Sequence, residues 1–298
     1  MEYHRPEGNP GDGAVPAARS RVVGMSQSSP PPSARPGTAL VTGASTGIGA
    51  EYARRLAQRG YSLVLVARRA ELLEALAEDL RERCGVDVEV LPADLGSAED
   101  TERVAERLRA EPDSGLEPVD LLVNNAGRGD GGPFIEQDPD DVDAMIDINV
   151  RSVLRLTRAV LPVQVARRAA GAATELGVIT VSSLAGEPVV NPGGSVYGAG
   201  KKFLTLWSES VAAEVRAAGV SVTVVLPGFV RTDMTRGVQE RGLPEVAFVP
   251  KEHIVRDSLL AWMARRPRVI PGVQYKTGDA LLKLLPRWLV RSVARRMA

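Results

Sequence analysis

The sequence predicts a single-domain α/β protein with a doubly wound parallel sheet. Short apolar runs alternate along the 298 residues with segments of helical composition, which is the order of consecutive βαβ units. The run Ser62–Val66 is apolar without interruption, as expected of a parallel strand that is buried on both faces. A glycine-rich turn also joins the first apolar run directly to the first helix. Together these three observations indicate a fold that binds a ligand at the ends of its strands.

Composition and charge argue against several classes of protein. The formal net charge is +0, whereas a general nucleic-acid binder carries a basic excess, so we expect no nucleic-acid partner. Cys84 is the single cysteine, which excludes an internal disulfide and fits a reducing, cytoplasmic location. The two histidines are His4 and His253. Neither a Ser-His-Asp hydrolase nor a histidine-rich metal site is therefore favoured, and we predict no metal.

The predicted domain spans residues 38–275 and follows a tail of different composition. Residues 1–37 are rich in Pro, Gly, Ser and Ala and lack an apolar period, so we predict a disordered tail that is no secretory signal. Met25 leaves open a later natural start. No run of about 20 apolar residues follows, so a membrane-spanning helix is not expected.

The first strand and helix predict a nucleotide site. Thr38–Thr42 is a short apolar strand that runs into a G-x-x-x-G-x-G turn, and the helix that follows is expected to end at Gly60. A strand, a glycine-rich turn and a helix direct backbone N–H groups and the positive helix end at a pyrophosphate. The spacing is neither G-x-G-x-x-G nor that of a Walker A loop. The expected cofactor contacts in this turn are Gly43, Ser45, Thr46, Gly47, Ile48 and Gly49.

The end of the second strand favours NADP(H) over NAD(H). An acidic residue at this position would bind the ribose 2′-hydroxyl, and an arginine accommodates a 2′-phosphate. Here Ala67 is followed by Arg68 and Arg69, whose guanidinium groups can bind phosphate in a bidentate manner. The alternative is that both arginines are surface residues at the start of a helix.

The alternation then continues, with more candidate ligands at strand ends. Asp94 and Leu95 follow the third strand, where the carboxylate would accept a hydrogen bond from the adenine amino group, and Asn124-Asn125-Ala126-Gly127 follows the fourth. In doubly wound sheets this carboxyl edge binds the ligand, so Asn125, Ala126 and Gly127 are expected cofactor contacts. The predicted elements are helix Glu71–Arg83, strand Val86–Leu91, helix Ala98–Ala110 and strand Val119–Val123.

A tyrosine and a lysine four residues apart indicate acid–base chemistry. Tyr197 and Lys201 would lie on one face of a helix, one turn apart. A free tyrosine titrates near pH ~10, and a neighbouring ammonium should lower that pKa so that the tyrosine can exchange protons near neutrality. Ser183 follows a β-rich run and could hydrogen-bond the same substrate oxygen. Ser182 is the neighbouring candidate, although it is expected at the strand end.

In combination these motifs resemble the short-chain dehydrogenase/reductase family, over roughly residues 38–272. The motifs that carry the resemblance, besides the glycine turn, are Asp94, Asn124-Asn125-Ala126-Gly127, Asn149, Ser183, Tyr197-Gly198-Ala199-Gly200-Lys201 and Pro227-Gly228. The resemblance implies a Rossmann-like domain with about seven parallel strands that forms a homodimer or homotetramer.

The resemblance also implies the roles of individual residues. Asn149, Ser183, Tyr197 and Lys201 would form a catalytic tetrad, in which Asn149 kinks helix Asp141–Arg168 and holds a water that relays protons to Lys201. Tyr197 and Lys201 would also contact the cofactor. After strand Val220–Leu226, a loop would bind the nicotinamide side through Pro227, Gly228, Val230 and Thr232.

Two departures from the family pattern affect these expectations. The gap from Ser183 to Tyr197 is one residue longer than the family's common spacing, so the loop around Asn191-Pro192-Gly193-Gly194 should bulge toward the pocket. Thr46 replaces the Arg or Lys that many NADP-preferring members carry, so Arg68 and Arg69 would have to determine the preference.

The C-terminal part is predicted to cover the pocket and then to leave the family pattern. Residues 231–249 have no period and should form a substrate lid, followed by helix Lys251–Arg265 and strand Val269–Pro271. Residues 276–298 then form a basic amphipathic helix, in which 279–297 carries an apolar face and four cations spaced by four. This helix either docks on protein or lies peripherally on an anionic membrane.

The sequence as a whole predicts an NADP(H)-dependent oxidoreductase that interconverts a small-molecule carbonyl and an alcohol by hydride transfer. The alternatives are a dehydratase or epimerase of the same fold, and a catalytically silent sensor that keeps the cofactor. The sensor is disfavoured because it would not need Lys201 beside Tyr197.

Overall fold

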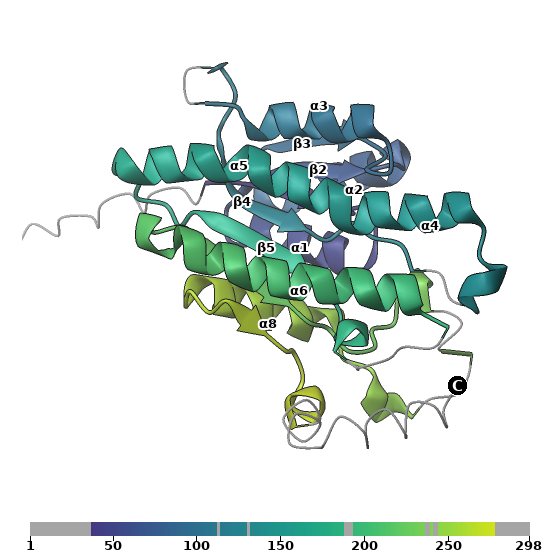
Figure 1. Ribbon diagram of the computed structural model, residues 1–298. Coiled ribbons are helices and arrows are strands. Elements are labelled where there is room, and N and C mark those ends of the chain that lie inside the picture. The colour runs from purple at the N-terminus through teal and green to yellow at the C-terminus, as the bar shows by residue number, and fades with distance from the viewer. Residues whose placement is uncertain are drawn as a thin grey trace, which may run out of the picture. The chain divides into compact units, whose positions relative to one another are not determined.

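The computed structural model describes residues 37–111, 114–129, 132–187, 193–235, 239–240 and 244–277 (Figure 1). The predicted tail, apart from Gly37, and the predicted basic helix 279–297 lie outside these residues. The same is true of most of the loop around 187–194 and of much of the lid.

The core of the structure is one sheet of seven parallel strands in the order β3-β2-β1-β4-β5-β6-β7. The predicted doubly wound sheet is therefore confirmed. The chain reverses its direction of winding between β1 and β4, and the carboxyl ends of these two central strands flank the crevice in which such sheets bind ligands. The strands are β1 Thr38–Thr42, β2 Ser62–Ala67, β3 Val88–Pro92, β4 Val119–Asn124, β5 Gly177–Val181, β6 Ser221–Val225 and β7 Arg268–Val269.

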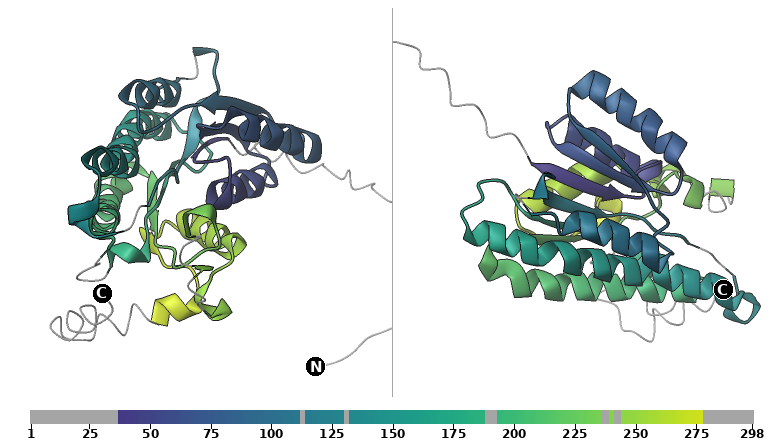
Figure 2. Two further views of the ribbon diagram at one scale, coloured as in Figure 1. Left: turned by 90° about the vertical axis from the view of Figure 1, so that its right-hand side faces the viewer. Right: turned by 90° about the horizontal axis from the view of Figure 1, so that it is seen from above.

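Helices cover both faces of the sheet, so successive strand residues pack into two separate cores (Figure 2). Leu63 and Leu65 of β2 join the core under α1, α2 and α8, whereas Val64 and Val66 join the core under α3, α5 and α6. This explains the uninterrupted apolar sequence of the strand. The helices are α1 Gly47–Ala57, α2 Ala70–Cys84, α3 Ala98–Leu108, α4 Pro139–Ile146, α5 Ser152–Ala169, α6 Ser195–Val215 and α8 Lys251–Met263.

Some predicted boundaries differ from the structure. The third strand begins at Val88 rather than Val86, because the ladder starts where Leu63 pairs with Val88. The last strand pairs only through Arg268 and Val269, since Pro271 has no N–H to extend the ladder. Helix α1 ends at Ala57, and Gly60, with φ +83°, lies beyond its C-cap.

The long helix predicted over 141–168 is three elements in the structure. Helix α4 leads into a π-helical turn, Asp147–Arg151, and α5 follows without a break in the chain direction. The expected irregularity at Asn149 is therefore present as a π turn, a feature that often occurs at functional sites. Among the described residues, no helix is long and apolar enough to cross a membrane.

Candidate functional site

A cavity of about 850 Å³ lies at the carboxyl ends of the strands. Its volume is in the range of small-molecule sites. It brings together residues from the ends of six strands, and every site residue expected from the sequence lines it except Gly49 and Asn149. The predicted residues in its wall are Gly43, Ser45, Thr46, Gly47, Ile48, Arg68, Arg69, Asp94, Leu95, Asn125, Ala126, Gly127, Ser183, Tyr197, Lys201, Pro227, Gly228, Val230 and Thr232.

Glycines let the backbone of the glycine-rich turn pack closely against the start of α1. Gly43 and Gly47 have backbone φ angles of +65° and +60°, which residues other than glycine rarely adopt. Gly49 does not line the cavity, but a Cβ there would lie 2.1 Å from the Gly43 carbonyl oxygen, so it lets the helix pack against the turn. Thr46, the N-cap, makes no side-chain hydrogen bond to the first turn, which also carries no acidic residue. The positive end of α1 therefore faces the cavity with no side-chain cap, as an anion site requires.

The two arginines after β2 lie at the same end of the cavity as this turn. Arg69 donates from Nη2 to Ser45 Oγ and to Thr46 Oγ1, at 3.3 Å each. Arg68 Nη1 lies 4.0 Å from Asp94 Oδ2, and its side chain is 73% exposed. Arg69 thus borders the turn, and Arg68 lines the same cavity beside Asp94, which also accepts from the Gly96 N–H at 3.0 Å.

The side chain of Asn125 ties β1 to β4. Its Nδ2 donates to the carbonyls of Thr42 and Gly43, at 2.9 and 3.3 Å. Thr42 Oγ1 in turn accepts from the N–H groups of Asn125 and Ala126, at 2.9 and 3.0 Å. The pair holds the glycine-rich turn against the end of β4. From the sequence, Thr42 is expected at the end of the first strand and is not assigned to the site.

Ser183, Tyr197 and Lys201 meet at the opposite end of the cavity. Ser183 follows β5, and the other two residues lie on the first turns of α6. Tyr197 and Ser183 both line the cavity, and their side chains are near enough to interact. Lys201 is 5% exposed, its Nζ donates to the Val181 carbonyl at 2.9 Å, and the same atom lies 5.7 Å from the centroid of the Tyr197 ring. The predicted neighbours are therefore close in space.

Burial is the main cause of the pKa shifts of Tyr197 and Lys201. It raises the pKa of Tyr197 above its usual 10.0, while the hydrogen bond with Ser183 lowers that pKa by less. The net shift is opposite to the lowering expected from Lys201. Burial also lowers the pKa of Lys201 from 10.5 to about 8, because an ammonium loses its hydration inside the protein.

Asn149 lies behind the cavity wall rather than in it. Its Oδ1 accepts from the Arg128 N–H at 3.0 Å, and its Nδ2 donates to the Arg128 carbonyl at 2.7 Å. A Cβ on Gly127 would lie 2.8 Å from Asn149 Oδ1 and 3.7 Å from Lys201 Nζ. Gly127 thus lies next to both side chains, and a side chain at this position would clash with Asn149 Oδ1.

Ser182 makes different contacts from Ser183. Its Oγ donates to the Lys201 carbonyl at 2.7 Å and pairs with Thr205 Oγ1 at 2.9 Å. These bonds join the end of β5 to α6. Ser182 therefore holds the helix that carries Tyr197, and Ser183 is the serine that meets the tyrosine, as the sequence indicated.

The loop after β6 lines the cavity and contacts both the glycine-rich turn and the segment that carries Ser183. A Cβ on Gly47 would lie 3.3 Å from Thr232 Cγ2, so Thr232 adjoins the glycine-rich turn. The Leu184 N–H donates to the Pro227 carbonyl at 3.0 Å, which ties the loop to the segment that carries Ser183.

Tyr275 is a site residue that sequence reasoning missed. Its hydroxyl donates to the Ala247 carbonyl at 2.6 Å and accepts from the Phe229 N–H at 3.1 Å. Its ring lies against Gly228, where a Cβ would come within 2.1 Å of the ring carbons. Tyr275 thus fastens the loop after β6 to the segment before α8. Its position beyond the family pattern gave no motif that could have identified it.

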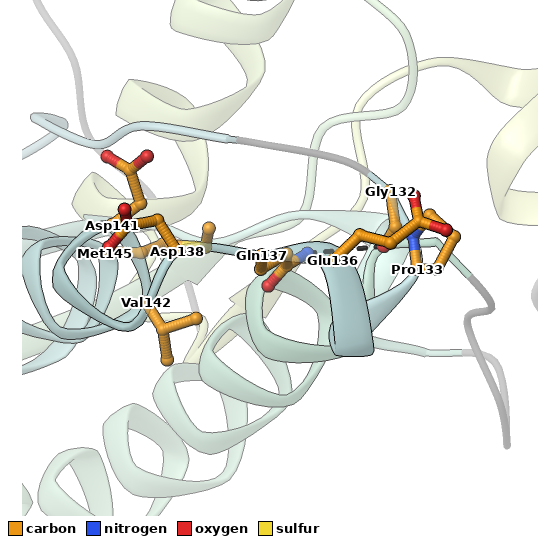
Figure 3. Close-up of a pocket in the computed structure, with 8 residues that line it drawn as sticks. All are labelled: Gly132, Pro133, Glu136, Gln137, Asp138, Asp141, Val142 and Met145. Atoms are coloured by element: carbon orange, nitrogen blue, oxygen red, sulfur yellow. Dashed lines mark hydrogen bonds between the residues drawn. The ribbon is translucent and has the colours of Figure 1, made fainter.

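Gly129, Phe229 and Met234 also line the cavity without having been predicted. A second cavity, of about 350 Å³, lies at the start of α4 and shares no lining residue with the first. Figure 3 shows its acidic wall and the bond from Gln137 Nε2 to the Gly132 carbonyl, at 3.2 Å. It contains none of the predicted site residues.

Known proteins resemble this chain over most of its length. The family model for short chain dehydrogenases matches residues 37–242. A very-long-chain 3-oxoacyl-CoA reductase from Anas platyrhynchos is 38% identical over 66% of this chain, although the match spans only 61% of that protein. The oxidoreductase UcpA from Escherichia coli K12 is 36% identical over 70% of this chain and 74% of its own length.

A solved structure agrees with this relationship. A short-chain dehydrogenase from Sphingobium yanoikuyae, in complex with NADPH, has a TM-score of 0.72 and 33% identity, and the match covers 84% of this chain and 96% of that one. The sheet order, the glycine-rich turn and the serine, tyrosine and lysine around one cavity indicate the same family. This chain belongs to the short chain dehydrogenase family of oxidoreductases.

Proposed function

We propose that the protein is an NADP(H)-dependent oxidoreductase that interconverts a carbonyl compound and an alcohol. The observation that carries this proposal is the meeting of Tyr197 and Ser183 in the cavity, with the ammonium of Lys201 buried beside the tyrosine ring. Two hydroxyls that lie near each other in one cavity can both point at one substrate oxygen. A carbonyl oxygen is the group that such a pair would polarise.

The cavity residues fit a nicotinamide dinucleotide phosphate. The pyrophosphate would bind at the start of α1, where Thr46 makes no cap and Gly47 presents no side chain. Arg69 borders that turn and Arg68 lines the same cavity beside Asp94, and both would bind the 2′-phosphate. When bound, the cofactor supplies or accepts the hydride at nicotinamide C4. The NADPH complex of the relative from Sphingobium yanoikuyae also favours this cofactor.

Tyr197 would be the proton donor in the direction of reduction. Because burial raises its pKa, the phenol is protonated at neutral pH and can give its proton to the carbonyl oxygen as the carbon is reduced. Ser183 would donate a hydrogen bond to the same oxygen and stabilise its negative charge. The phenolate that remains would be stabilised by Lys201, whose Nζ lies 5.7 Å from the ring centroid. In oxidation the same groups act in reverse.

The test is turnover by the Tyr197→Phe variant. We expect the parent protein to consume NADPH with members of a carbonyl panel. We expect Tyr197→Phe to lower kcat by at least about 100-fold, the lower limit for a general acid, and to bind NADPH nearly as well as the parent, because the ring still packs. A kcat within tenfold of the parent would exclude Tyr197 as the acid. Conversion of an alcohol or sugar substrate with no net NADPH consumption would instead favour the dehydratase or epimerase, and NADPH binding without any turnover would favour the sensor.

A further inference from the structure

Residues 183–187, here called the serine turn, have one face on the cavity. The first three line the cavity, whereas Gly186 and Glu187 do not. The Gly186 N–H donates to the Ser183 carbonyl at 3.2 Å. The next N–H, that of Glu187, donates to the Leu184 carbonyl at 3.0 Å. The turn is therefore a closed unit that begins at the serine of the proposed reaction and ends at Glu187.

The direction of the Ser183 hydroxyl depends on this turn. Its Oγ accepts from the Ala185 N–H at 3.1 Å. A hydroxyl has one proton and two lone pairs, so this bond occupies a lone pair and leaves the proton available for a substrate oxygen. A donor to a developing negative charge must be held at hydrogen-bond distance from it. Any shift of the turn would therefore move the serine away from the oxygen that it stabilises.

Two backbone contacts fix the first part of the serine turn. The Leu184 N–H donates to the Pro227 carbonyl at 3.0 Å, which ties the turn to the loop after β6. A Cβ on Gly186 would lie 2.5 Å from the Lys202 nitrogen and 2.9 Å from the Lys201 carbonyl carbon, so the turn packs directly on the backbone of α6. Neither contact involves the last residue of the turn.

The side chain of Glu187 fixes the end of the turn. Its Oε2 lies 3.2 Å from Nη2 of Arg268, on β7, and 3.3 Å from Nζ of Lys202, on α6. The Lys202 side chain is 54% exposed, whereas that of Arg268 is 23% exposed. Water screens a pair with an exposed lysine, which then contributes little. Arg268 is therefore the main anchor of the carboxylate.

Stability alone does not explain a carboxylate at this position. The Glu187 side chain is 11% exposed, and its Oε1 is buried without a hydrogen-bond partner among the described residues. A buried polar atom without a partner loses its hydration and gains nothing in return. Replacing a buried ion pair with apolar residues is often neutral or even stabilising. The anchoring of the turn that carries Ser183 does explain the carboxylate.

We propose that Glu187 is a positioning residue for carbonyl reduction: its ion pair with Arg268 anchors the serine turn to the edge strand of the sheet and thereby holds the Ser183 hydroxyl toward the substrate oxygen. This inference rests on the proposed function. Because Glu187 does not line the cavity, it acts on the reaction only through Ser183.

The test measures the single-turnover rate of NADPH oxidation with a carbonyl compound that the parent reduces. Glu187→Ala should lower this rate by about tenfold or more, since a displacement of about 1 Å in a catalytic group can cost about 100-fold. The KM for NADPH should stay within about twofold of the parent value, because Arg68 and Arg69 lie after β2, away from the serine turn. Glu187→Gln keeps the shape and can still accept from Arg268, so it should lose less than Glu187→Ala.

A double-mutant comparison decides whether the effect passes through the serine. Ser183→Ala removes the hydroxyl that is positioned, so in that background Glu187→Ala should lower the rate by less than about twofold more. An effect independent of the serine would instead appear in full. Glu209→Gln is the matched control, because Glu209 pairs with Nη1 of the same Arg268 at 3.4 Å but lies outside the serine turn. It should leave the rate within about twofold of the parent.

The outcomes separate this inference from the proposed function. If Glu187→Ala reacts at the parent rate, if its effect is as large without the Ser183 hydroxyl as with it, or if Glu209→Gln has the same effect, the positioning role is wrong while carbonyl reduction stands. Melting temperatures confirm folding, and Glu187→Gln is judged by the same criteria if Glu187→Ala does not fold.

Hydrogen exchange decides if the parent reduces no carbonyl compound and the proposed function fails. The backbone N–H groups of residues 184–187 should then exchange at least about tenfold faster in Glu187→Ala than in the parent, because an unanchored turn opens more often. Exchange in Glu209→Gln should stay at the parent rate. Faster exchange in Glu187→Ala alone supports the anchoring of Ser183 by Glu187, and equal exchange in Glu187→Ala and the parent overturns it.

Discussion

Replacing Lys201 with methionine should make the protein more stable while it abolishes turnover. The ammonium is 5% exposed, and burial lowers its pKa from 10.5 to about 8. Each step of one in pKa corresponds to 1.36 kcal/mol, so keeping this lysine charged at neutral pH costs about 3 kcal/mol of folding free energy. Methionine has a similar unbranched shape and carries no charge.

The lost hydrogen bond reduces the gain. Lys201 Nζ donates to the Val181 carbonyl at 2.9 Å, and leaving that buried acceptor unpaired costs about 1 kcal/mol. The net stabilisation at pH 7 is then about 2 kcal/mol. In a domain of this size that free energy corresponds to a rise in Tm of about 4 to 8 °C.

The effect should depend on pH in a defined direction. Between the pKa of about 8 in the folded protein and the usual value near 10.4 in the unfolded chain, the unfolded state binds more protons. Stability of the parent therefore rises with pH across this window, and the penalty of the charged lysine, fully present below pH ~8, disappears toward pH ~10.4. The advantage of Lys201→Met should shrink accordingly.

The assay is thermal unfolding of the parent and variants without cofactor, at pH 7 and pH 10. Lys202→Met is the control, because Lys202 neighbours Lys201 on α6 but is 54% exposed and pairs with Glu187 at 3.3 Å. A surface change of this kind should alter the unfolding free energy by less than about 0.5 kcal/mol. If Lys201→Met melts at or below the parent at pH 7, or if its advantage does not shrink at pH 10, the buried charge does not have the cost assigned to it.

Two further predictions concern the two ends of the cavity. Ala67→Asp combined with Arg68→Leu should reverse or erase a preference for NADPH over NADH in kcat/KM, because it introduces the acid that binds a 2′-hydroxyl and removes a phosphate ligand; a parent that already prefers NADH would contradict the reading of this strand end. Tyr275→Phe should raise the KM for NADPH only modestly, since the ring still covers Gly228, whereas Tyr275→Leu should raise it by about tenfold or more as the loop loses its fastening. Equal KM values for the two variants would show that the ring does not order this loop.

The fold and most of the cavity wall could be predicted because they depend on local sequence. Strands buried on both faces have a distinctive apolar composition, and Ser62–Val66 is one of them. In a parallel sheet the residues that follow such strands all lie at one edge, so the sequence alone could assign Arg68, Asp94, Asn125 and Ser183 to one site. The order of the elements and the parallel direction of the strands were sufficient for this assignment.

Other features depend on distances between segments that no local pattern encodes. Tyr275 reaches Gly228, Phe229 and Ala247 only because the chain returns after β7. The direction of the Tyr197 pKa shift was also mispredicted from spacing alone, because the one-turn separation from Lys201 says nothing about how deeply both groups are buried.

The pair of Lys201 and Tyr197 suggests why the fold would keep two ionisable groups in surroundings that are unfavourable for each of them. A buried ammonium destabilises the protein, and a buried phenol resists ionisation, so each group alone is in an unfavourable setting. Once the phenol gives up its proton, however, the two charges become opposite and lie in a poorly hydrated site, where their attraction is strong. The charge that costs stability in the resting protein would thus stabilise the state formed during proton transfer. This is the difference between ground-state and transition-state interaction on which catalysis depends, and Lys201→Met tests both sides of it with one substitution.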